Sequence, residues 1–301
     1  MFKPNTFVKA TATTLAACML MACGAGDDST SNEDLSPSEE IKYKLSLASA
    51  EAGDTGIIGK SIYTVKVTDL DGLAVYGETP AIKPMMDMTS GMNHGAPHLG
   101  CTETDDHGDS DCTVYFPMAS SMKSEGGEVM IMGTWTVDVE LANAENLSFS
   151  PNVMMPMVET SKAKLKGTSE TGDTVGGIPR TYLVLNTAPM MIMSNRSVEL
   201  FIATKEGMNF PVLATNTILS EGSEDALNVD SIDVLVSANK DAAAGDWTEA
   251  TSDGKGTWTA DIEGYTDAFY VKLSVNGDAK MANDLDYATF EKMASMPAMG
   301  H

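Results

Sequence analysis

The sequence predicts an all-β protein with two β-sandwich domains, which follow a leader and a flexible tether and precede a short helical tail. Short runs of alternating apolar and polar residues recur along the chain, with turn-forming residues between them. One run, Gly-Thr-Trp-Thr-Val-Asp-Val at 133–139, returns almost unchanged at 256–262. A repeated strand of this kind indicates a second sandwich of the same general type. A length of 301 residues fits two such domains with tails.

The same patterns divide the chain into five predicted segments. Alternation begins at Ile41 and continues through the strand that ends at Leu141, where the first sandwich closes. The predicted segments are a leader at 1–22, a tether at 23–40, sandwiches at 41–143 and 144–278, and a methionine-rich tail at 279–301.

The leader has the features of an export signal. Lys3 and Lys9 precede an apolar stretch at 10–22 that is too short to span a membrane. Its end, Leu-Met-Ala-Cys at 20–23, resembles a bacterial lipoprotein box, which implies that Cys23 is lipidated and becomes the mature N-terminus. We therefore expect an exported protein, anchored by lipid to the periplasmic face of the outer membrane. An ordinary secreted protein with an unmodified Cys23 is the alternative.

Charge restricts the partners of this chain. The tether at 24–40 is polar and acidic, so it cannot bury enough apolar surface to fold. The formal charge of the chain is −24, and loss of Lys3 and Lys9 with the leader brings it to about −26. Nucleic acid and anionic lipid both require basic surfaces, so neither is an expected partner. We expect the lipid anchor to be the only membrane contact.

The segment 84–98 concentrates soft metal ligands. Thioethers favour Cu(I), and imidazole also suits copper. Its turn-forming residues and irregular pattern predict an exposed loop. The alternative to a copper site is that these methionines fill gaps in the core. The candidate ligands in this segment are Met85, Met86, Met88, Met92, His94 and His98.

Two cysteines enclose an acidic loop. Cys18 leaves with the leader and Cys23 carries lipid, so Cys101 and Cys112 remain as the expected disulfide pair of an exported protein. The loop holds His107 among oxygen donors, which suits either a divalent ion or an acidic solvated turn. Copper binding by the two thiolates is a further alternative, which requires a reducing environment.

The first half of the chain resembles a known family. A strand that ends in Asp-Leu-Asp-Gly at 69–72, a methionine-rich loop with Met-Asn-His-Gly at 92–95, and the closing strand at 133–139 are similar to YtkA-like or FixH-like domains. This resemblance covers about residues 41–142 and implies an immunoglobulin-like sandwich that is associated with copper handling. It implies that Met88, Met92 and His94 are ligands. The longer loop, His98 and the cysteine pair depart from the family pattern.

Methionine clusters recur after the first sandwich. Met-Met-x-Met occurs at 85–88, 154–157 and 190–193, either as paired sulfurs on strands or as buried methionines between the domains. The chain ends with Met296, Met299 and His301, which resemble the metal loop of the same family. A short helix is expected from Asp284 to Ala294 before this end. The tail is either a ligand donor or a disordered end.

These patterns favour a metal-binding protein over an enzyme. The sequence contains no nucleophile elbow, zinc-protease motif, phosphate loop or dinucleotide fingerprint. We expect a protein that stores, buffers or delivers Cu(I) or Cu(II), with a copper-accepting envelope protein as a possible partner. A structural or adhesive envelope module without metal is the alternative. An oxidant sink of exposed methionines is a third, and the two loop histidines argue against it.

Overall fold

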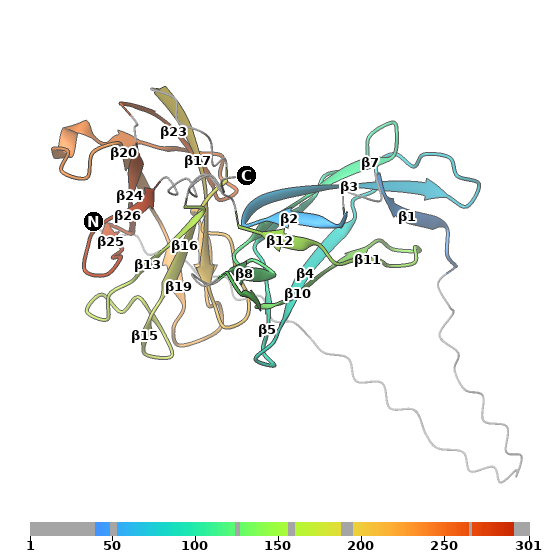
Figure 1. Ribbon diagram of the computed structural model, residues 1–301, viewed down its shortest axis with the longest axis horizontal. Coiled ribbons are helices and arrows are strands. Elements are labelled where there is room, and N and C mark those ends of the chain that lie inside the picture. Colours follow the sequence, from blue (N-terminus) through green and yellow to red (C-terminus); the bar gives the residue numbers. More distant parts are fainter. Residues whose placement is uncertain are drawn as a thin grey trace, which may run out of the picture. The chain divides into compact units, whose positions relative to one another are not determined.

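The computed structural model describes residues 40–48, 53–123, 127–155, 160–187, 195–264 and 267–291, and these ranges are built mainly from β-strands (Figure 1). No α-helix occurs in these ranges, and helical geometry is limited to short 3-10 turns such as η2 (Ala244–Asp246). This confirms the predicted all-β class. The immunoglobulin-like topology and the five segment boundaries stay predictions.

Two antiparallel sheets from residues 43–149 face each other. Their strand orders are β1–β3–β7–β6 and β11–β10–β4–β5. Side chains from both sheets form one apolar cluster, to which Val65, Val114 and Val137 belong. The strands are β1 (Tyr43–Leu47), β3 (Gly59–Asp69), β4 (Ala81–Met88), β5 (Asn93–Gly95), β6 (His98–Cys101), β7 (Asp109–Phe116), β10 (Gly133–Glu140) and β11 (Leu147–Phe149).

Smaller pairs extend this half of the chain. β2 (Thr55–Ile57) pairs in parallel with β12 (Asn152–Met154), and β8 (Ser121–Lys123) forms a hairpin with β9 (Val129–Ile131). In that hairpin Met122 lies directly opposite Met130, and both side chains are exposed. These two methionines therefore lie outside the apolar cluster.

Two further sheets form the second half. Their orders are β13–β16–β17–β23–β22 and β21–β20–β24–β25, with β26 also on β24. Leu200, Trp258 and Leu273 belong to the cluster between them. The strands are β13 (Lys162–Lys166), β16 (Thr181–Asn186), β17 (Asn195–Lys205), β20 (Ile232–Ser237), β21 (Thr248–Glu249), β22 (Thr251–Ser252), β23 (Thr257–Glu263), β24 (Ala268–Val275), β25 (Asp278–Ala279) and β26 (Ala288–Glu291). Short pairs complete this half: β14 (Thr174–Val175) with β15 (Ile178–Pro179), and β18 (Thr217–Leu219) with β19 (Leu227–Val229).

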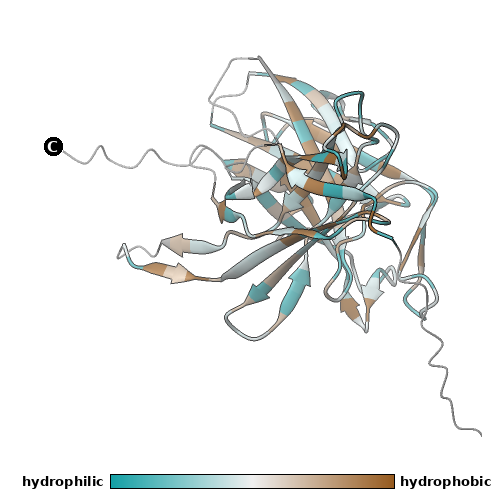
Figure 2. Ribbon diagram, turned by 90° about the vertical axis from the view of Figure 1, so that its right-hand side faces the viewer, coloured by the Kyte–Doolittle hydropathy of each residue, from teal (hydrophilic) through white to brown (hydrophobic). Residues whose placement is uncertain are grey.

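Alternation of apolar and polar residues explains these strands. Successive side chains of a strand point to opposite faces, so a period of two buries one face. In β10 the side chains of Trp135, Val137 and Val139 are buried, whereas the intervening residues are more exposed. Figure 2 shows the same alternation of apolar and polar residues along the longer strands.

Apolar side chains also join the two halves. Tyr115 of β7 stacks on Phe201 of β17, with ring centroids 3.7 Å apart and planes within 8°. Leu183 and Leu185 of β16 and Ala203 of β17 complete this small cluster. One face of the sheet β13–β16–β17 therefore packs on the core of the second half, and part of its other face packs on Tyr115.

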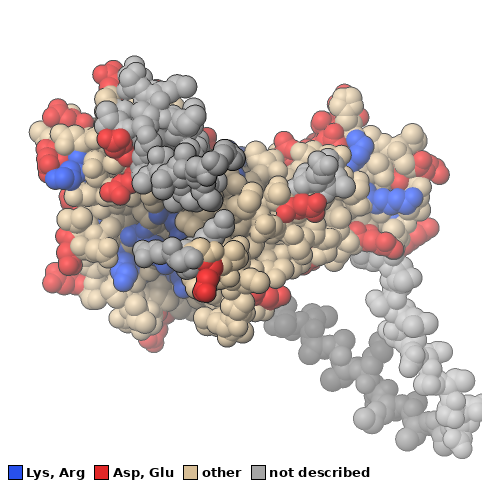
Figure 3. All heavy atoms as spheres, in the orientation of Figure 1, with Lys and Arg blue, Asp and Glu red and all other residues tan. Residues whose placement is uncertain are grey.

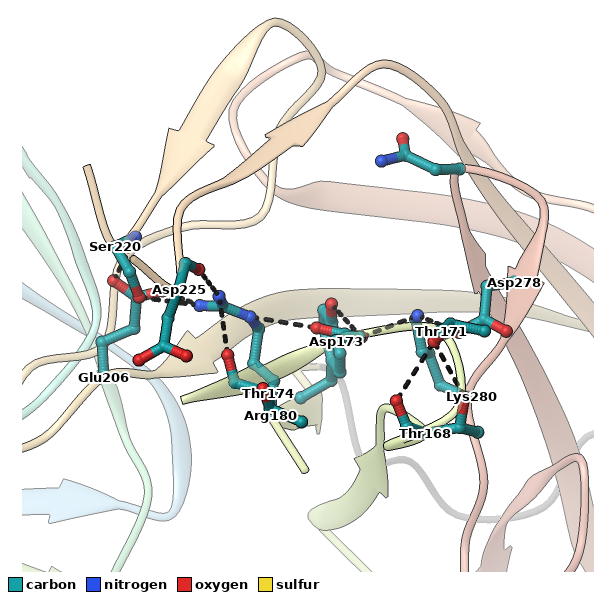
Figure 4. A network of polar contacts seen from close by, with 12 residues as sticks. Thr168, Thr171, Asp173, Thr174, Arg180, Glu206, Ser220, Asp225, Asp278 and Lys280 are labelled. Atoms are coloured by element: carbon teal, nitrogen blue, oxygen red, sulfur yellow. Dashed lines mark hydrogen bonds and ion pairs between the residues drawn. The ribbon is translucent and has the colours of Figure 1, made fainter. Parts of the chain in front are cut away.

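A charged network is buried in the second half (Figure 4). Arg180 is fully buried and contacts Asp173, Glu206 and the hydroxyl of Ser220. Lys280 is also buried and forms ion pairs of 2.7 Å with both Asp173 and Asp278. Burial of charges is tolerated only where partners compensate them, as they do here.

The expected helix at 284–294 is wrong for the part that the structure describes. Residues 288–291 form β26, which pairs with β24, and Ala288 and Phe290 are buried on one face. Phe290 stacks on Phe269 at 4.8 Å. Asp284 has a φ of 67°, which is not the extended geometry of a helix N-cap. Aromatic burial every second residue outweighs helix propensity in this stretch, and residues 292–301 lie outside the described residues.

Candidate metal centre

The methionine segment forms a β-hairpin, so the expected irregular loop is wrong for most of its length. β4 runs to Met88 and pairs with β5 and with β10. The amide of Met88 donates to the carbonyl of Met92 at 2.9 Å, and Gly91 takes a φ of 81° in the turn between them. That positive φ suits glycine, which lacks a Cβ. Pairing on both sides of β4 overrides the low strand propensity of Pro84.

The hairpin separates the candidate ligands onto two faces. Met86 is fully buried, His94 is 8% exposed, and Met88 packs against the same apolar cluster. Met85 lies on the opposite face of β4 and is 40% exposed. Met92 lies in the turn and is exposed. The segment therefore offers an inner set and an outer set of ligands.

The inner set lies in a row across three strands. Trp135 of β10 is the register partner of Met86, and Met86 is the partner of His94 on β5. Paired side chains on one face of a sheet lie about 4.5–5.5 Å apart at Cβ. Gly133 is required by the close approach of β4, because a Cβ there would clash with the carbonyl oxygen of Asp87 and lie 2.9 Å from the methyl carbon of Met86. A thioether, an imidazole and an indole are thus neighbours.

The ring of His94 has one satisfied nitrogen and one without a partner. Nδ1 lies 2.8 Å from the carbonyl oxygen of Gly95, and a carbonyl only accepts, so Nδ1 carries the proton. Nε2 then presents a lone pair, and it is buried with no hydrogen-bond partner among the described residues. Metal-binding histidines characteristically donate their second N–H to a carbonyl or carboxylate in this way.

Aromatic rings surround the His94 imidazole. Trp135 meets it edge-on with centroids 5.3 Å apart, and Phe210 does so at 6.0 Å. The indole N–H of Trp135 donates to the carbonyl of Met118 at 3.0 Å, which fixes the orientation of the indole. These rings supply no oxygen ligand of the kind that hard cations prefer.

Met85 and His98 line a groove of about 690 Å³, together with Asn209 and Phe210. Met92 is not part of this lining. The amide of Gly95 donates to the carbonyl of Met208 at 3.0 Å, which ties the hairpin to this groove. Partial burial lowers the pKa of His98, so its imidazole is neutral and able to bind a metal at pH 7.

The Cys101–Cys112 disulfide is confirmed. The two residues are register partners on β6 and β7, with Cα atoms 3.9 Å apart. Because both sulfurs are engaged, the oxidised protein has no thiolate copper site there. His107 is exposed in the enclosed loop, 3.7 Å from Asp106. In the part of the chain that the structure describes, no group of three or more His, Cys, Asp and Glu side chains is placed to hold an ion.

Several predicted residues lie outside the described residues. These are the lipidation candidate Cys23, the tail candidates Met296, Met299 and His301, and the whole third methionine cluster at 190–193. Of the second cluster, Met154 and Met155 are described, and both are exposed.

Sequence reasoning missed Trp135, Gly133 and Phe210 as neighbours of the candidate ligands. Trp135 stood out only as an aromatic anchor of its strand, because its pairing with Met86 depends on the register between β10 and β4. The alternation that runs from Ile82 to Met88 was an available signal. It places Met86 on the apolar face and Met85 on the other.

Comparison with protein-family models and with curated proteins finds no match to this chain. The resemblance to YtkA-like or FixH-like domains therefore stays a prediction from short motifs. The described residues include no helix that is long and apolar enough to cross a membrane.

Proposed function

We propose that this protein binds Cu(I) through His94 and Met86, as an exported and lipid-anchored protein that stores, buffers or delivers copper. The observation that carries this proposal is the His94 ring, whose Nδ1 is held by the Gly95 carbonyl and whose buried Nε2 has no partner in the described residues. An unpaired buried polar atom costs stability, so its retention calls for a reason. A bound metal ion supplies one.

The neighbours of His94 suit a soft monovalent ion. The Met86 thioether is the register partner of His94, and Met88 lies on the same face of β4. Thioether and imidazole ligands together favour Cu(I). The Trp135 ring adds an aromatic surface that attracts cations. Cu(II) would require harder ligands, and His107 and His98 remain the candidates for it.

The export features support a role outside the cytoplasm. The leader, the lipoprotein-like Cys23 and the Cys101–Cys112 disulfide all fit an oxidising envelope compartment. A copper-accepting envelope protein would be the partner for delivery. The proposal involves no catalysis.

One observation favours the alternative of a structural or adhesive envelope module. Met86 is fully buried in the apolar cluster, where a flexible side chain also serves as packing. In that case His94 is a core residue that fills the space between Trp135 and Phe210. The two functions differ in whether the row binds a metal.

Competition for Cu(I) with a chromophoric chelator tests the proposal on residues 24–301. The double variant Met86→Leu/His94→Leu removes both ligands and largely preserves volume. Met122→Leu/Met130→Leu is a control that removes two exposed thioethers from the β8–β9 hairpin. We expect the first variant to bind Cu(I) at least about 100-fold more weakly, because loss of even an outer-shell partner of a ligand costs about 10- to 100-fold and this variant loses two ligands. The control should retain wild-type affinity.

Two further variants separate the other candidate ligands. Met85→Leu/His98→Gln tests the outer groove, and a chain that ends at Glu291 tests Met296, Met299 and His301. Negligible Cu(I) binding by the wild type, or equal binding by the wild type and Met86→Leu/His94→Leu, would refute the proposed site. Negligible binding by the wild type would leave the structural module as the better explanation.

A further inference from the structure

The outer face of the sheet β13–β16–β17 has an apolar part and a basic part. The apolar part, which includes Leu183, Leu185 and Phe201, packs with Tyr115 of the first half. Lys162 marks the boundary, because its ammonium donates to the carbonyl of Pro117 at 2.5 Å. Beyond it the face is open and forms a groove of about 1110 Å³.

Strand geometry gathers lysines in this groove. Lys162, Lys164 and Lys166 share one face of β13, because they alternate with Ala163 and the buried Leu165. In the same row of the sheet Lys166 pairs with Thr181, and Thr181 pairs with Lys205 of β17. Reciprocal hydrogen bonds between the backbones of Lys166 and Met281 fix the edge of the groove. All four lysines and Thr181 line it.

This basic groove contrasts with the rest of the protein. The chain has 43 acidic and 19 basic residues, so carboxylates outnumber basic groups more than twofold. Lys60, Lys66, Lys83, Arg180, Lys240, Lys272 and Lys280 all form ion pairs. In the described ranges Lys164, Lys166 and Lys205 form none, and Asp284 is the single carboxylate in the groove lining. Figure 3 shows basic side chains gathered over β13 and β16, on a face where other basic groups are scattered.

Burial and a neighbouring lysine both disfavour the charged form of Lys162. Burial is the main cause that lowers its pKa, and the neighbouring charge of Lys164 lowers it further. Like charges that share a groove destabilise each other, so a bound anion would relieve this repulsion. The groove is therefore a local exception to the acidic surface of the molecule.

We propose that this groove binds a ligand with two or more phosphate groups. Lys164 and Lys166 are two residues apart on one strand, which places their Cα atoms about 7 Å apart. Lys166 and Lys205 are separated by one intervening strand, which places their Cα atoms about 10 Å apart. Charges at this spacing match an oligophosphate better than a single phosphate. Lysine ammonium groups are established phosphate-binding point charges.

The lining argues against nucleic acid as the source of the phosphates. Binding of single strands uses aromatic side chains on which bases stack. The described residues that line this groove include no aromatic side chain. A free oligophosphate and a phosphorylated lipid headgroup share the required chemistry, and the test below separates them.

Calorimetric titration with tripolyphosphate at low ionic strength tests the site on residues 24–301. The variant Lys164→Gln/Lys166→Gln/Lys205→Gln removes three groove charges. Its control, Lys42→Gln/Lys44→Gln/Lys255→Gln, makes the same change in net charge at lysines outside the groove. We expect the groove variant to bind roughly tenfold or more weakly, because exposed charge pairs each contribute modestly. The control should bind like the wild type.

Two further measurements complete the test. Tripolyphosphate should raise the pKa of Lys162, as followed by NMR of its side chain, in the wild type but not in the groove variant. Sedimentation with cardiolipin vesicles, whose headgroup carries two phosphates, identifies a headgroup as the source if binding of the same unlipidated chain depends on the three groove lysines. No tripolyphosphate binding by the wild type, or equal losses in groove variant and control, would overturn the proposal.

Discussion

The strands β10 and β23 carry nearly the same sequence, yet their surroundings differ in chemistry. Both place the tryptophan of Gly-Thr-Trp-Thr in an apolar cluster, Trp135 in one half and Trp258 in the other. Trp135 pairs with Met86, whose next partner is His94. Trp258 pairs with Leu200 and with Ser252. The repeated strand thus provides a packing anchor, and the strand beside it decides whether candidate metal ligands lie next to the tryptophan.

The two halves also differ in how they are reinforced. The first half has the Cys101–Cys112 disulfide between neighbouring strands. The second half has the buried network of Arg180, Asp173 and Lys280. A disulfide restricts mainly the unfolded chain, whereas a buried ion network stabilises only if every charge keeps its partner. Substitutions should therefore affect the halves differently.

The largest expected effect is that of Asp173→Ala in the second half. It removes the carboxylate that bridges Arg180 and Lys280 and leaves two buried cations short of a partner. Breaking one side of a buried ion pair costs about 3–5 kcal/mol of unfolding free energy. Urea unfolding measures this loss. Asp241→Ala, which breaks the exposed pair with Lys240, is the control and should cost less than about 1 kcal/mol. Equal costs would contradict the buried role.

Loss of the disulfide is the matching change in the first half. Cys101→Ser/Cys112→Ser should lower the unfolding free energy by about 3 kcal/mol, the chain-entropy value for a loop of this size. Urea unfolding with and without reductant measures the effect. Reductant should destabilise the wild type and leave the variant unchanged. A variant as stable as the oxidised wild type would show that the β6–β7 pairing alone holds the loop.

The contrast between the halves shows what the sequence could predict. Period-two burial in β10 and the cysteine pair needed only local pattern and elimination, and both were confirmed. The row of Trp135, Met86 and His94 depends on the register between strands far apart in the chain. A shift of one residue would turn Met86 outward and Met85 inward. The alternation from Ile82 to Met88 is enough to assign Met86 to the apolar face, but local pattern could not show which side chains of β10 and β5 lie beside it.

A smaller effect on stability is expected from a change in the row of Trp135, Met86 and His94. His94→Leu removes the unpaired Nε2 from apolar surroundings, but it also removes the Nδ1–H bond to the Gly95 carbonyl. The two effects oppose each other, so the unfolding free energy should change by less than about 1 kcal/mol. The same substitution should weaken Cu(I) binding by about tenfold or more. Urea unfolding of the metal-free protein, together with the chelator competition, measures both effects. A large destabilisation would instead identify His94 as a packing residue, like Leu200 in the second half.

The smallest expected effect concerns a type of turn that occurs in both halves. Asp105 Oδ1 accepts the amides of His107 and Asp109, each at 2.9 Å, and Asp253 Oδ1 accepts those of Lys255 and Thr257 in the same pattern. The Asp109 amide is the largest cause that holds the pKa of Asp105 below its usual range, so this carboxylate stabilises the fold above about pH 4.

Asp105→Asn should therefore slightly lower the unfolding free energy at pH 7. The difference from the wild type should shrink as pH falls through the pKa of the folded protein, because the carboxylate is then protonated in both states. Urea unfolding at pH 7 and at pH 3 measures this, with Asp106→Asn on the same exposed loop as the control. A difference that stays constant with pH would mean that the loss reflects turn geometry and not charge. In that case the turn at Asp105 would differ from the turn at Asp253 only because the Cys101–Cys112 disulfide closes its loop.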